Sequence, residues 1–478
     1  MGKSGHYPCR SHATSVRPAR RKARPIVDAG DRSLNAAAIA YYVSSINHLR
    51  HVADRGCRAR NAVLRSVFNP RRSPRIMRPY LSICAALAVA VRVDAQQSDV
   101  RADSTSHQRI QRGWERSGVP ALNFDADEGF GIGAAAELYN YGVGVRPYRF
   151  TIQPLVLFTS KGRRDMTLFF DAPTLLPQEW RVSAFVGSER QLAEPYYGVG
   201  NETVHDQNAE RAPNSYYYRF GRARVRATAD FQHRIGTSSA ARVLFGVGFA
   251  RSTIDLTPFD SGTTLLANEL GGRTPAPERA NYVRAGLLWD TRDREISPHN
   301  GTWAEVLLQR VTKRVGATEG FTRWTTTARK YVPVTARLTF AQRIIAQGIQ
   351  GVAPFDELST IQSSFKQGEG LGGSSSIRGI PKDRYIGKAL LLSNSELRWR
   401  AVDFSLLGRG SFLALSGFVD AGRVWQDHFR IENAFSDLHA SYGGGVRVGI
   451  GPSFIVATDV GHSSESTASV YIGLGWMY

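Results

Sequence analysis

Cysteine is scarce in this sequence and absent from most of it. The three cysteines, Cys9, Cys57 and Cys84, all precede residue 95. A long stretch without thiols is typical of a chain exported to an oxidising compartment, where a free cysteine would mispair. The absence also excludes thiolate zinc sites and cysteine nucleophiles from the rest of the chain.

Organised catalytic and cofactor motifs are missing as well. No Ser, His and Asp residues are spaced as a catalytic triad. Residues 368–373 contain a glycine pattern similar to a dinucleotide site, but the strand and helix that this site requires are not predicted around it. Asp290, Asp293 and His299 could be metal ligands, yet they fall in a predicted turn. The sequence therefore predicts no enzyme, no cofactor and no metal.

The net charge of +20 is concentrated near the N-terminus. Residues 1–76 hold 14 Arg and 2 Lys against 3 Asp, which leaves only +7 for the remaining residues. This Arg-rich, aperiodic segment is predicted to be a disordered leader. A nucleic-acid-binding arm is one interpretation, and a start codon assigned too far upstream is the favoured one. No nucleic-acid partner is expected for the body of the chain.

A secretory signal is predicted over residues 77–95. Met77 and Arg78 precede an apolar run from Leu81 to Val91, and small residues at Val93 and Ala95 define a cleavage site before Gln96. The run is too short to cross a bilayer as a helix. Residues 96–117 are then expected to form a short periplasmic segment.

Strict alternation of polar and apolar residues dominates the sequence after Val119. Arg222, Arg224 and Arg226, for example, share one face, and the residues between them are apolar. Sixteen strands are predicted, over residues 118–124, 128–142, 149–158, 163–171, 179–188, 214–232, 238–251, 280–290, 301–311, 320–332, 336–348, 387–401, 411–420, 439–449, 452–461 and 468–478. Aromatic residues near strand ends are expected to form interfacial girdles: Tyr139, Tyr141, Trp180, Tyr282 and Trp303.

The connections between these strands alternate in length. The long ones, over 189–213, 252–279, 349–386 and 421–438, all follow odd-numbered strands and would lie on one side of a membrane. Segments of this length, apolar on one face only, suit tilted strands that cross a bilayer around a wet lumen. The sequence thus predicts an all-β, multi-pass transmembrane antiparallel barrel of about sixteen strands over residues 118–478.

Five short motifs resemble those of the BamA/TamA family of outer-membrane assembly factors, also called bacterial surface antigen barrels. The resemblance is clearest over 280–478. It rests on residues 289–293 with Pro298 and Gly301, on residues 372–380 around Arg378-Gly379, on residues 395–398, on residues 417–422, and on the terminal aromatic Tyr478.

The resemblance implies that the connection 349–386 folds back into the lumen. Arg378 would then pair with Asp420 and lie near Phe418, and Gly379 would allow a tight backbone turn. Glu396 could be a second partner of the arginine. The alternative is a mobile surface loop with a solvated Arg378. At the C-terminus, Leu474, Trp476 and Tyr478 would form the terminal strand signal of the family.

Three functions stay open at this point. The chain could assist the insertion, assembly or translocation of outer-membrane proteins, which would require a weak seam between its first and last strands. It could instead be a passive or plugged pore, or the membrane anchor of a multi-chain system. Residues 96–117 are too few for the periplasmic POTRA modules of family members that recruit clients. The expected partners are outer-membrane lipid and lipopolysaccharide, the assembly machinery, and client proteins or a separate periplasmic partner.

Overall fold

A computed structural model describes residues 113–125, 129–142, 147–176, 180–211, 216–236, 240–257, 263–365, 367–406, 409–450 and 454–478. The predicted leader and signal peptide lie outside the described residues, and so do residues 96–112 of the predicted periplasmic segment. The fold below is that of the unit formed by His107–Tyr478.

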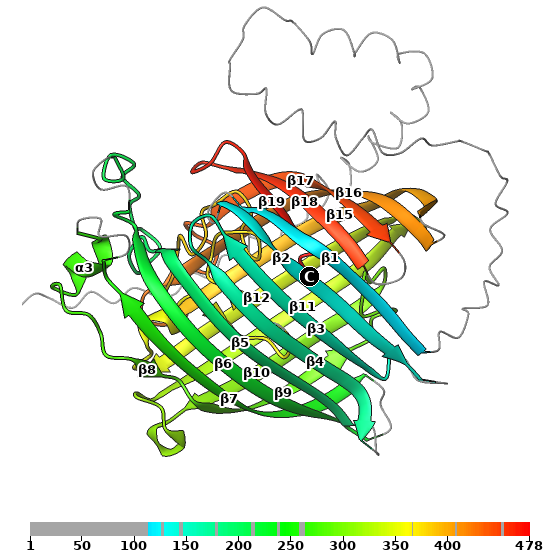
Figure 1. The fold of residues 1–478 in the computed structure, drawn as a ribbon, viewed down its shortest axis with the longest axis horizontal. Helices are drawn as coiled ribbons and strands as arrows, with labels where there is room; N and C mark the ends of the chain where they lie inside the picture. The colour runs from blue at the N-terminus through cyan, green and yellow to red at the C-terminus, as the bar shows by residue number, and fades with distance from the viewer. Residues whose placement is uncertain are drawn as a thin grey trace, which may run out of the picture. The chain divides into compact units, whose positions relative to one another are not determined.

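Sixteen long strands and a few short elements make up this unit (Figure 1). The long strands are β1 (Gly113–Asp125), β2 (Gly129–Tyr141), β3 (Phe150–Thr159), β4 (Arg164–Leu176), β5 (Trp180–Pro195), β6 (Arg219–Arg234), β7 (Ala241–Asp255), β9 (Tyr282–Asp290), β10 (Gly301–Val311), β11 (Phe321–Thr335), β12 (Leu338–Gly351), β15 (Ala389–Leu406), β16 (Arg409–Trp425), β17 (His439–Ile450), β18 (Phe454–Ser463) and β19 (Ser469–Leu474). The short elements are α3 (Leu265–Glu269), β8 (Glu278–Arg279), β13 (Thr360–Ile361), β14 (Gly368–Glu369) and two 3-10 turns, Lys313–Val315 and Phe355–Glu357.

The long strands form one antiparallel sheet in which each strand pairs with its neighbours in the chain. The two ends of the sheet meet where β1 pairs with β19 at Asp125 and Tyr471. The predicted sixteen-stranded antiparallel barrel is therefore confirmed.

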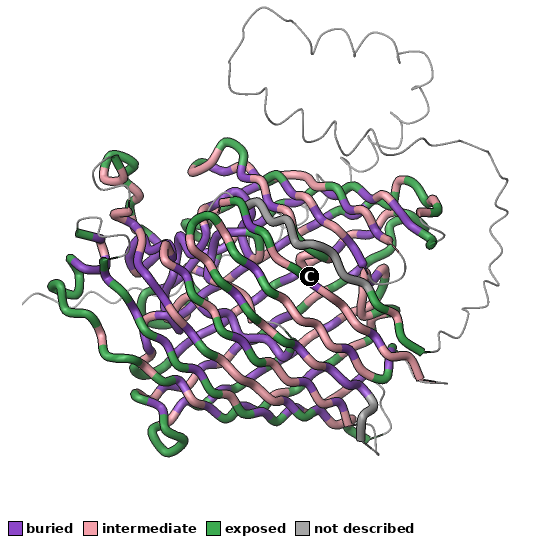
Figure 2. The backbone as a smooth tube through the Cα atoms, viewed as in Figure 1, coloured by how far each residue is buried: buried purple, intermediate pink, exposed green. Residues whose placement is uncertain are grey.

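Side chains on the outer face of the wall are mostly apolar. Figure 2 shows exposed and buried residues alternating along the strands, as the two-residue period of a strand requires. Ile132, Val186, Leu287, Leu308 and Val419 are each more than half exposed. An apolar outer face of this size is favourable in contact with lipid. In water it would be a large exposed apolar patch, which soluble proteins avoid. The barrel is transmembrane.

The inner face carries the charged side chains. Arg222 and Arg224 are each 7% exposed and face inward, as their alternation predicts, while Val225, next to Arg224, is 47% exposed on the outside. Most of these inward charges are paired, so the lumen is a network of ion pairs rather than an open aqueous channel.

The long connections gather at one end of the barrel, which we call the loop end. They span 196–218, 256–281, 352–388 and 426–438 and follow β5, β7, β12 and β16, in agreement with the prediction. The opposite end, which we call the turn end, carries the shorter connections. Among the described helices, none is long and apolar enough to cross a membrane.

The structure corrects several details of the prediction. β5 extends to Pro195 instead of ending at residue 188. β1 begins at Gly113, not residue 118, because residues 113–117 pair with β2 although their sequence does not alternate clearly. β19 ends at Leu474 rather than at residue 478, because the backbone turns at Gly475, where φ is +79°. Tyr139, Tyr282 and Trp303 are at most 5% exposed, so these three aromatics pack inside the barrel instead of in a lipid-facing girdle.

Candidate functional site in the barrel lumen

The connection 352–388, which we call the lumen loop, folds into the barrel. Its residues Leu371 and Ile377 are fully buried and Ile380 is 2% exposed. They pack with Leu390, Leu392 and other apolar residues of the wall in one core cluster. The lumen loop therefore has a hydrophobic core of its own inside a polar lumen, which a solvated surface loop would lack.

Polar contacts attach the first half of the lumen loop to the wall. Arg323 of β11 is fully buried and pairs with Glu357, with Nη1 2.9 Å from Oε2, and it donates to the Glu357 carbonyl at 2.7 Å. Ser252 of β7 donates to Asp356 at 2.6 Å. Gln347 of β12 donates through Nε2 to the Thr360 carbonyl at 2.9 Å.

Arg378, at the tip of the lumen loop, binds Asp420 of β16. Its Nε and Nη2 donate to the two carboxylate oxygens at 2.9 and 3.1 Å, and its backbone N–H donates to the same group at 3.2 Å. Both side chains are 0% exposed. This two-pronged geometry uses the planar fork that distinguishes arginine from lysine. The structure thus brings together the pair that the family resemblance implies.

The other two residues predicted around Arg378 lie beside it. The guanidinium carbon is 3.4 Å from the ring centroid of Phe418, and Nη1 is 3.8 Å from Oε2 of Glu396. Stacking on the ring covers one face of the guanidinium while its edge bonds the carboxylates. The distance to Glu396 is that of an ion pair without a hydrogen bond.

Sequence reasoning missed two further members of this cluster. Asp459 of β18 lies 3.4 Å from Nη1 of Arg378, and Arg447 of β17 holds the same carboxylate at 2.7 and 2.9 Å. The two arginines and the three carboxylates, Asp420, Glu396 and Asp459, nearly balance one another in charge. Asp459 follows the inward alternation of its strand, which was the one available signal for it.

Gly379 allows the tip to approach the wall. Its φ is +99°, a conformation that favours glycine, and an added Cβ would lie 2.8 Å from the backbone of Gly461 and His462. Gly461 has the converse requirement, since its own Cβ would meet the Arg378 carbonyl at 2.6 Å. The backbones of loop and wall are in direct contact here.

The tip also binds the last strand of the barrel. The Gly379 N–H donates to the Tyr471 hydroxyl of β19 at 3.1 Å, and Ser463 donates to the Gly379 carbonyl at 2.7 Å. Tyr471 is the residue that pairs with Asp125 of β1. One side chain therefore joins the lumen loop to the closing point of the sheet.

That closing point, which we call the seam, is the weakest contact between neighbouring long strands. β1 pairs with β2 along its whole length, from Gly113 to Asp125, but with β19 only at Asp125. β19 in turn has six residues and pairs with β18 from Ser469 to Leu474. Most of the outer edge of β1 thus lacks a backbone partner among the described residues, an arrangement that invites pairing with another strand.

The three residues of the predicted C-terminal signal are separated by the turn at Gly475. Leu474 is 44% exposed on the outer face, whereas Tyr478 is 7% exposed and packs inside the barrel with Tyr331 and Ala341. Trp476 donates to Ser297 of the turn end at 3.1 Å.

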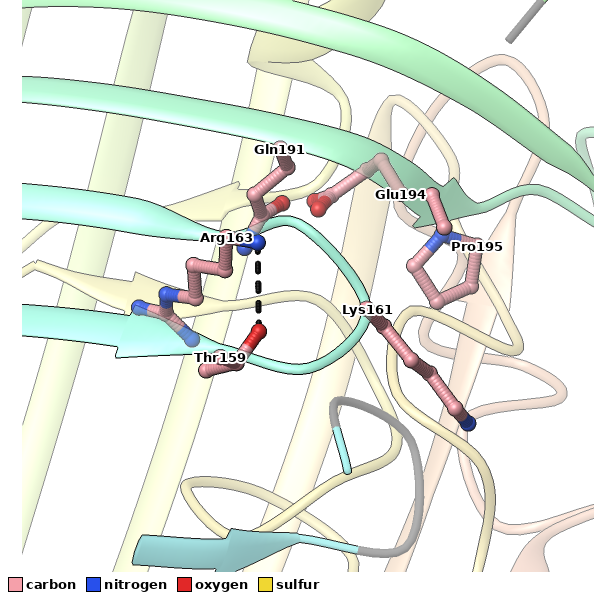
Figure 3. A pocket seen from close by; sticks show the side chains of 7 residues that line it. Thr159, Lys161, Arg163, Gln191, Glu194 and Pro195 are labelled. Atoms are coloured by element: carbon pink, nitrogen blue, oxygen red, sulfur yellow. Dashed lines mark hydrogen bonds between the residues drawn. The ribbon is translucent and has the colours of Figure 1, made fainter. Parts of the chain in front are cut away.

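Loops cover the lumen loop at the loop end. Arg384 bonds Glu465 at 2.7 Å and Thr203 at 2.6 Å, and the Tyr385 ring stacks on His439 with centroids 3.6 Å apart. A small, shallow hollow lies at the same end, between the β3–β4 hairpin and β5 (Figure 3). Both Lys161 and Glu194 line it, so it has no single preferred charge. Among the described residues no cluster of three metal-ligating side chains occurs.

Comparison with known proteins adds the following. A model of the Omp85 superfamily domain matches residues 154–455. None of the curated proteins matches the sequence. Among solved structures, BamA from Haemophilus ducreyi lacking POTRA domains 1-3 is similar, with 11% identity, a TM-score of 0.47 and coverage of 76% of this chain and 70% of that one. CdiB from Escherichia coli has 12% identity and a TM-score of 0.47, over 76% of this chain and 62% of that one. CdiB from Acinetobacter baumannii has 10% identity and a TM-score of 0.43, over 77% and 60%. The chain thus covers less than two thirds of either CdiB structure.

Proposed function

Because the chain belongs to the Omp85 superfamily, whose domain model spans most of the barrel, we propose that it assists the insertion or translocation of other proteins at the outer membrane through the seam between β1 and β19. The barrel would lie in the outer membrane with its loop end outside and its turn end in the periplasm. Its partners would be lipopolysaccharide and phospholipid on the outer face, the assembly machinery, and client proteins.

The unpaired edge of β1 carries this proposal. Among the described residues, β1 has one strand partner instead of two from Gly113 to Phe124, so the backbone groups on its outer edge have no strand to bond. In lipid, each such group costs several kcal/mol if it stays unbonded, so the edge favours pairing with an incoming strand. A passive pore would gain nothing from such an edge.

The filled lumen argues against the pore alternative. Arg378, Leu371 and Ile377 of the lumen loop are fully buried within the barrel. Ions crossing the barrel would have to displace this loop from its core cluster and from Asp420. A route through the wall leaves these contacts in place.

A disulfide across the seam tests the proposal. The structure pairs Asp125 with Tyr471, and continuing this antiparallel register by one residue would place position 124 opposite position 472. Cysteines at Phe124 and Ile472 lock this position without disturbing the Tyr471 contact to the lumen loop. No native cysteine follows Cys84, so residues 85–478 form no background disulfide. We expect the oxidised variant to lose the ability to support outer-membrane protein levels in cells depleted of the wild-type chain, and to regain it on reduction.

A matched control places cysteines at Leu168 and Val186. These residues pair between β4 and β5, both face outward, and lie far from the seam in strand order. This disulfide should leave function intact. Full function of the oxidised Phe124–Ile472 variant would reject the seam as the route, and equal loss in both variants would point to general rigidity instead.

A further inference from the structure

Four exposed arginines lie on the outer face of the wall near its loop end. They are Arg164 of β4, Arg190 of β5, Arg251 of β7 and Arg279 of β8, and we call them the arginine patch. Within the described part of the chain, their guanidinium groups have no carboxylate partner and no hydrogen-bond acceptor. The inward arginines of the lumen, by contrast, are mostly paired with acids.

The arginine patch consists of two cross-strand pairs. Arg164 lies directly opposite Arg190 between β4 and β5, and Arg251 lies directly opposite Arg279 between β7 and β8. Side chains in such positions have Cβ atoms about 5 Å apart, and like charges placed there repel each other. Two guanidinium groups at this spacing can instead hold one phosphate between them, because each offers a planar fork of donors to its oxygens. Each pair is therefore unfavourable when empty and favourable with a phosphate bound.

The arginine patch borders the apolar band of the wall. On β7, the exposed residues Val247 and Phe249 precede Arg251 at the outward positions. On β4, Arg164 is the first residue, and the exposed Met166 follows it toward the middle of the wall. With the loop end outside, the patch lies where the hydrocarbon layer ends and the headgroups of the outer leaflet begin.

One strand, β6, separates the two pairs. Arg190 is opposite Ala223 of β6, and Ala223 is opposite Thr253 of β7, which lies two residues beyond Arg251. Two strand spacings across the sheet and one two-residue step along it place the Cα atoms of Arg190 and Arg251 about 12 Å apart. Ala223 and the exposed Val225 form the surface between them, so no long side chain obstructs a ligand that joins the pairs. Such a ligand needs two phosphates with a rigid group of roughly this length between them.

The arginine patch belongs to one side of the barrel. Among the described residues, the outward positions on the loop-end halves of β12, β17 and β18 include Gln350, Tyr442 and Val460, and no arginine or lysine. A nonspecific attraction to an anionic surface would be served by charge on every side. The one-sided placement favours a single bound molecule.

We propose that the arginine patch binds one molecule of lipid A, the phosphorylated disaccharide that anchors lipopolysaccharide in the membrane. The phosphate at each end of the disaccharide would lie between one pair of arginines, and the acyl chains would lie against the apolar band. The assignment rests on the proposed function for its orientation, with the loop end outside, but not on the seam. A phospholipid, which has a single phosphate beside its glycerol, fills one pair at most.

The test measures lipid binding by the purified full chain in a neutral detergent. The probes are bisphosphorylated lipid A, its monophosphorylated form and phosphatidylglycerol, and native mass spectrometry counts the molecules that stay bound. We expect one lipid A per chain, with an affinity at least about tenfold higher than for either probe with a single phosphate, because each phosphate adds charge-assisted hydrogen bonds.

Two pair variants locate the site. Arg164→Gln with Arg190→Gln, and Arg251→Gln with Arg279→Gln, should each lower the affinity for lipid A about tenfold or more. Either variant should also lose the discrimination between the two forms of lipid A. The matched control is Arg337→Gln with Arg400→Gln, which removes two exposed arginines at the turn end, where both lie near Asp403. Binding by this control should equal that of the wild type.

Thermal unfolding gives a second measurement that a folding defect would not reproduce. In detergent without lipid, each pair variant should unfold at or above the wild-type temperature, because it loses the repulsion between like charges. Lipid A should raise the unfolding temperature of the wild type more than that of either variant. Equal binding of lipid A by the wild type and both pair variants would overturn the proposal, and so would equal affinity for lipid A and phosphatidylglycerol. Neither result bears on the seam disulfide, which is read from protein levels in cells.

Discussion

Single buried charges hold the interior of this barrel together. Arg378 and Asp420 are both fully buried, and removal of Arg378 leaves the Asp420 carboxylate without the guanidinium that pairs with it. Arg378→Ala should therefore destabilise the barrel by about 3–5 kcal/mol and expose the lumen loop to protease. Heat-modifiable gel mobility and limited proteolysis measure the two effects.

The control for Arg378 is Arg337→Ala. Arg337 is 57% exposed and lies 3.6 Å from the exposed Asp403, so its loss should cost less than about 1 kcal/mol. Equal effects of the two substitutions, or no change in loop protection for Arg378→Ala, would reject the buried pair as an anchor.

A carboxyl group in the lumen loop gives the barrel a predictable pH dependence. Burial raises the pKa of Asp383, with Lys382 partly opposing the shift. A raised pKa means that the folded state disfavours the ionised form. Stability should therefore be greatest below the ordinary carboxyl pKa of about 4 and fall as pH rises toward the raised value.

Asp383→Asn should remove that dependence without breaking the fold. An asparagine keeps the acceptor for the Gly370 N–H, which lies 2.7 Å from Oδ1, and tolerates the left-handed φ of +50° at this position. Thermal unfolding of both proteins between pH 5 and pH 8 makes the comparison. If the unfolding temperature of the variant changes with pH as steeply as that of the wild type, Asp383 does not cause the pH dependence.

At the residue level, the sequence was informative where the family resemblance implied proximity. Arg378, Gly379, Asp420, Phe418 and Glu396 were chosen from motifs in one loop and two strands, and they lie within one cluster. The motifs did not identify Asp459, Arg447 or Tyr471. The partners of these residues depend on the register of the strands and on the path of the lumen loop, which no local sequence pattern encodes.

At the level of elements, alternation predicted strands well and strand ends poorly. β5 carries the largest error, since it extends to Pro195 instead of ending at residue 188. Pairing with a neighbouring strand can extend a strand regardless of its own pattern, as residues 113–117 show against β2. β19 ends where its backbone turns, at Gly475.

The turn 291–300 is an element that closes the lumen at the turn end. Arg181 of β5 reaches Glu295 in this turn with two bonds of 2.7 and 2.9 Å, and Ile296 packs against Phe412 and Ile455. Glu295→Ala should lower the stability of the barrel by about 1–3 kcal/mol, because it leaves part of a buried guanidinium unbonded.

Arg294→Ala is the neighbouring control for this turn. Its side chain is 54% exposed and its ion pair with Asp293 is 3.5 Å long, so less than about 1 kcal/mol should be lost. Unfolding midpoints in detergent compare the two. A Glu295 variant as stable as the Arg294 variant would show that the turn is not anchored through Arg181.

At the level of the whole molecule, the barrel is a filled cylinder. Replacing residues 360–384 by a short Gly-Ser linker removes the tip and the buried residues Leu371, Ile377 and Ile380 of the lumen loop while leaving the wall strands intact. In planar bilayers, this variant should show large, steady ion conductance that the wild-type barrel lacks. Equal conductance of the two would mean that the lumen loop does not obstruct the barrel.

The class of the molecule was evident from its sequence, since strand count, loop side and membrane-crossing pattern all follow from composition and periodicity. The sequence did not show how the interior of the barrel is filled. The positions of the lumen loop and of residues 475–478 depend on contacts between segments far apart in the sequence, such as Gly379 with Tyr471 and Tyr478 with Asn394.

Tyr471 contacts the lumen loop through its hydroxyl and belongs to the seam through its backbone. Any energetic coupling between these two contacts must be reciprocal. Separation of β1 from β19 would then weaken the hydrogen bond between the Gly379 N–H and the Tyr471 hydroxyl. A change that strengthens this hydrogen bond would make the two strands harder to separate. A ligand that binds the lumen loop would therefore change how readily the seam opens without contacting the seam.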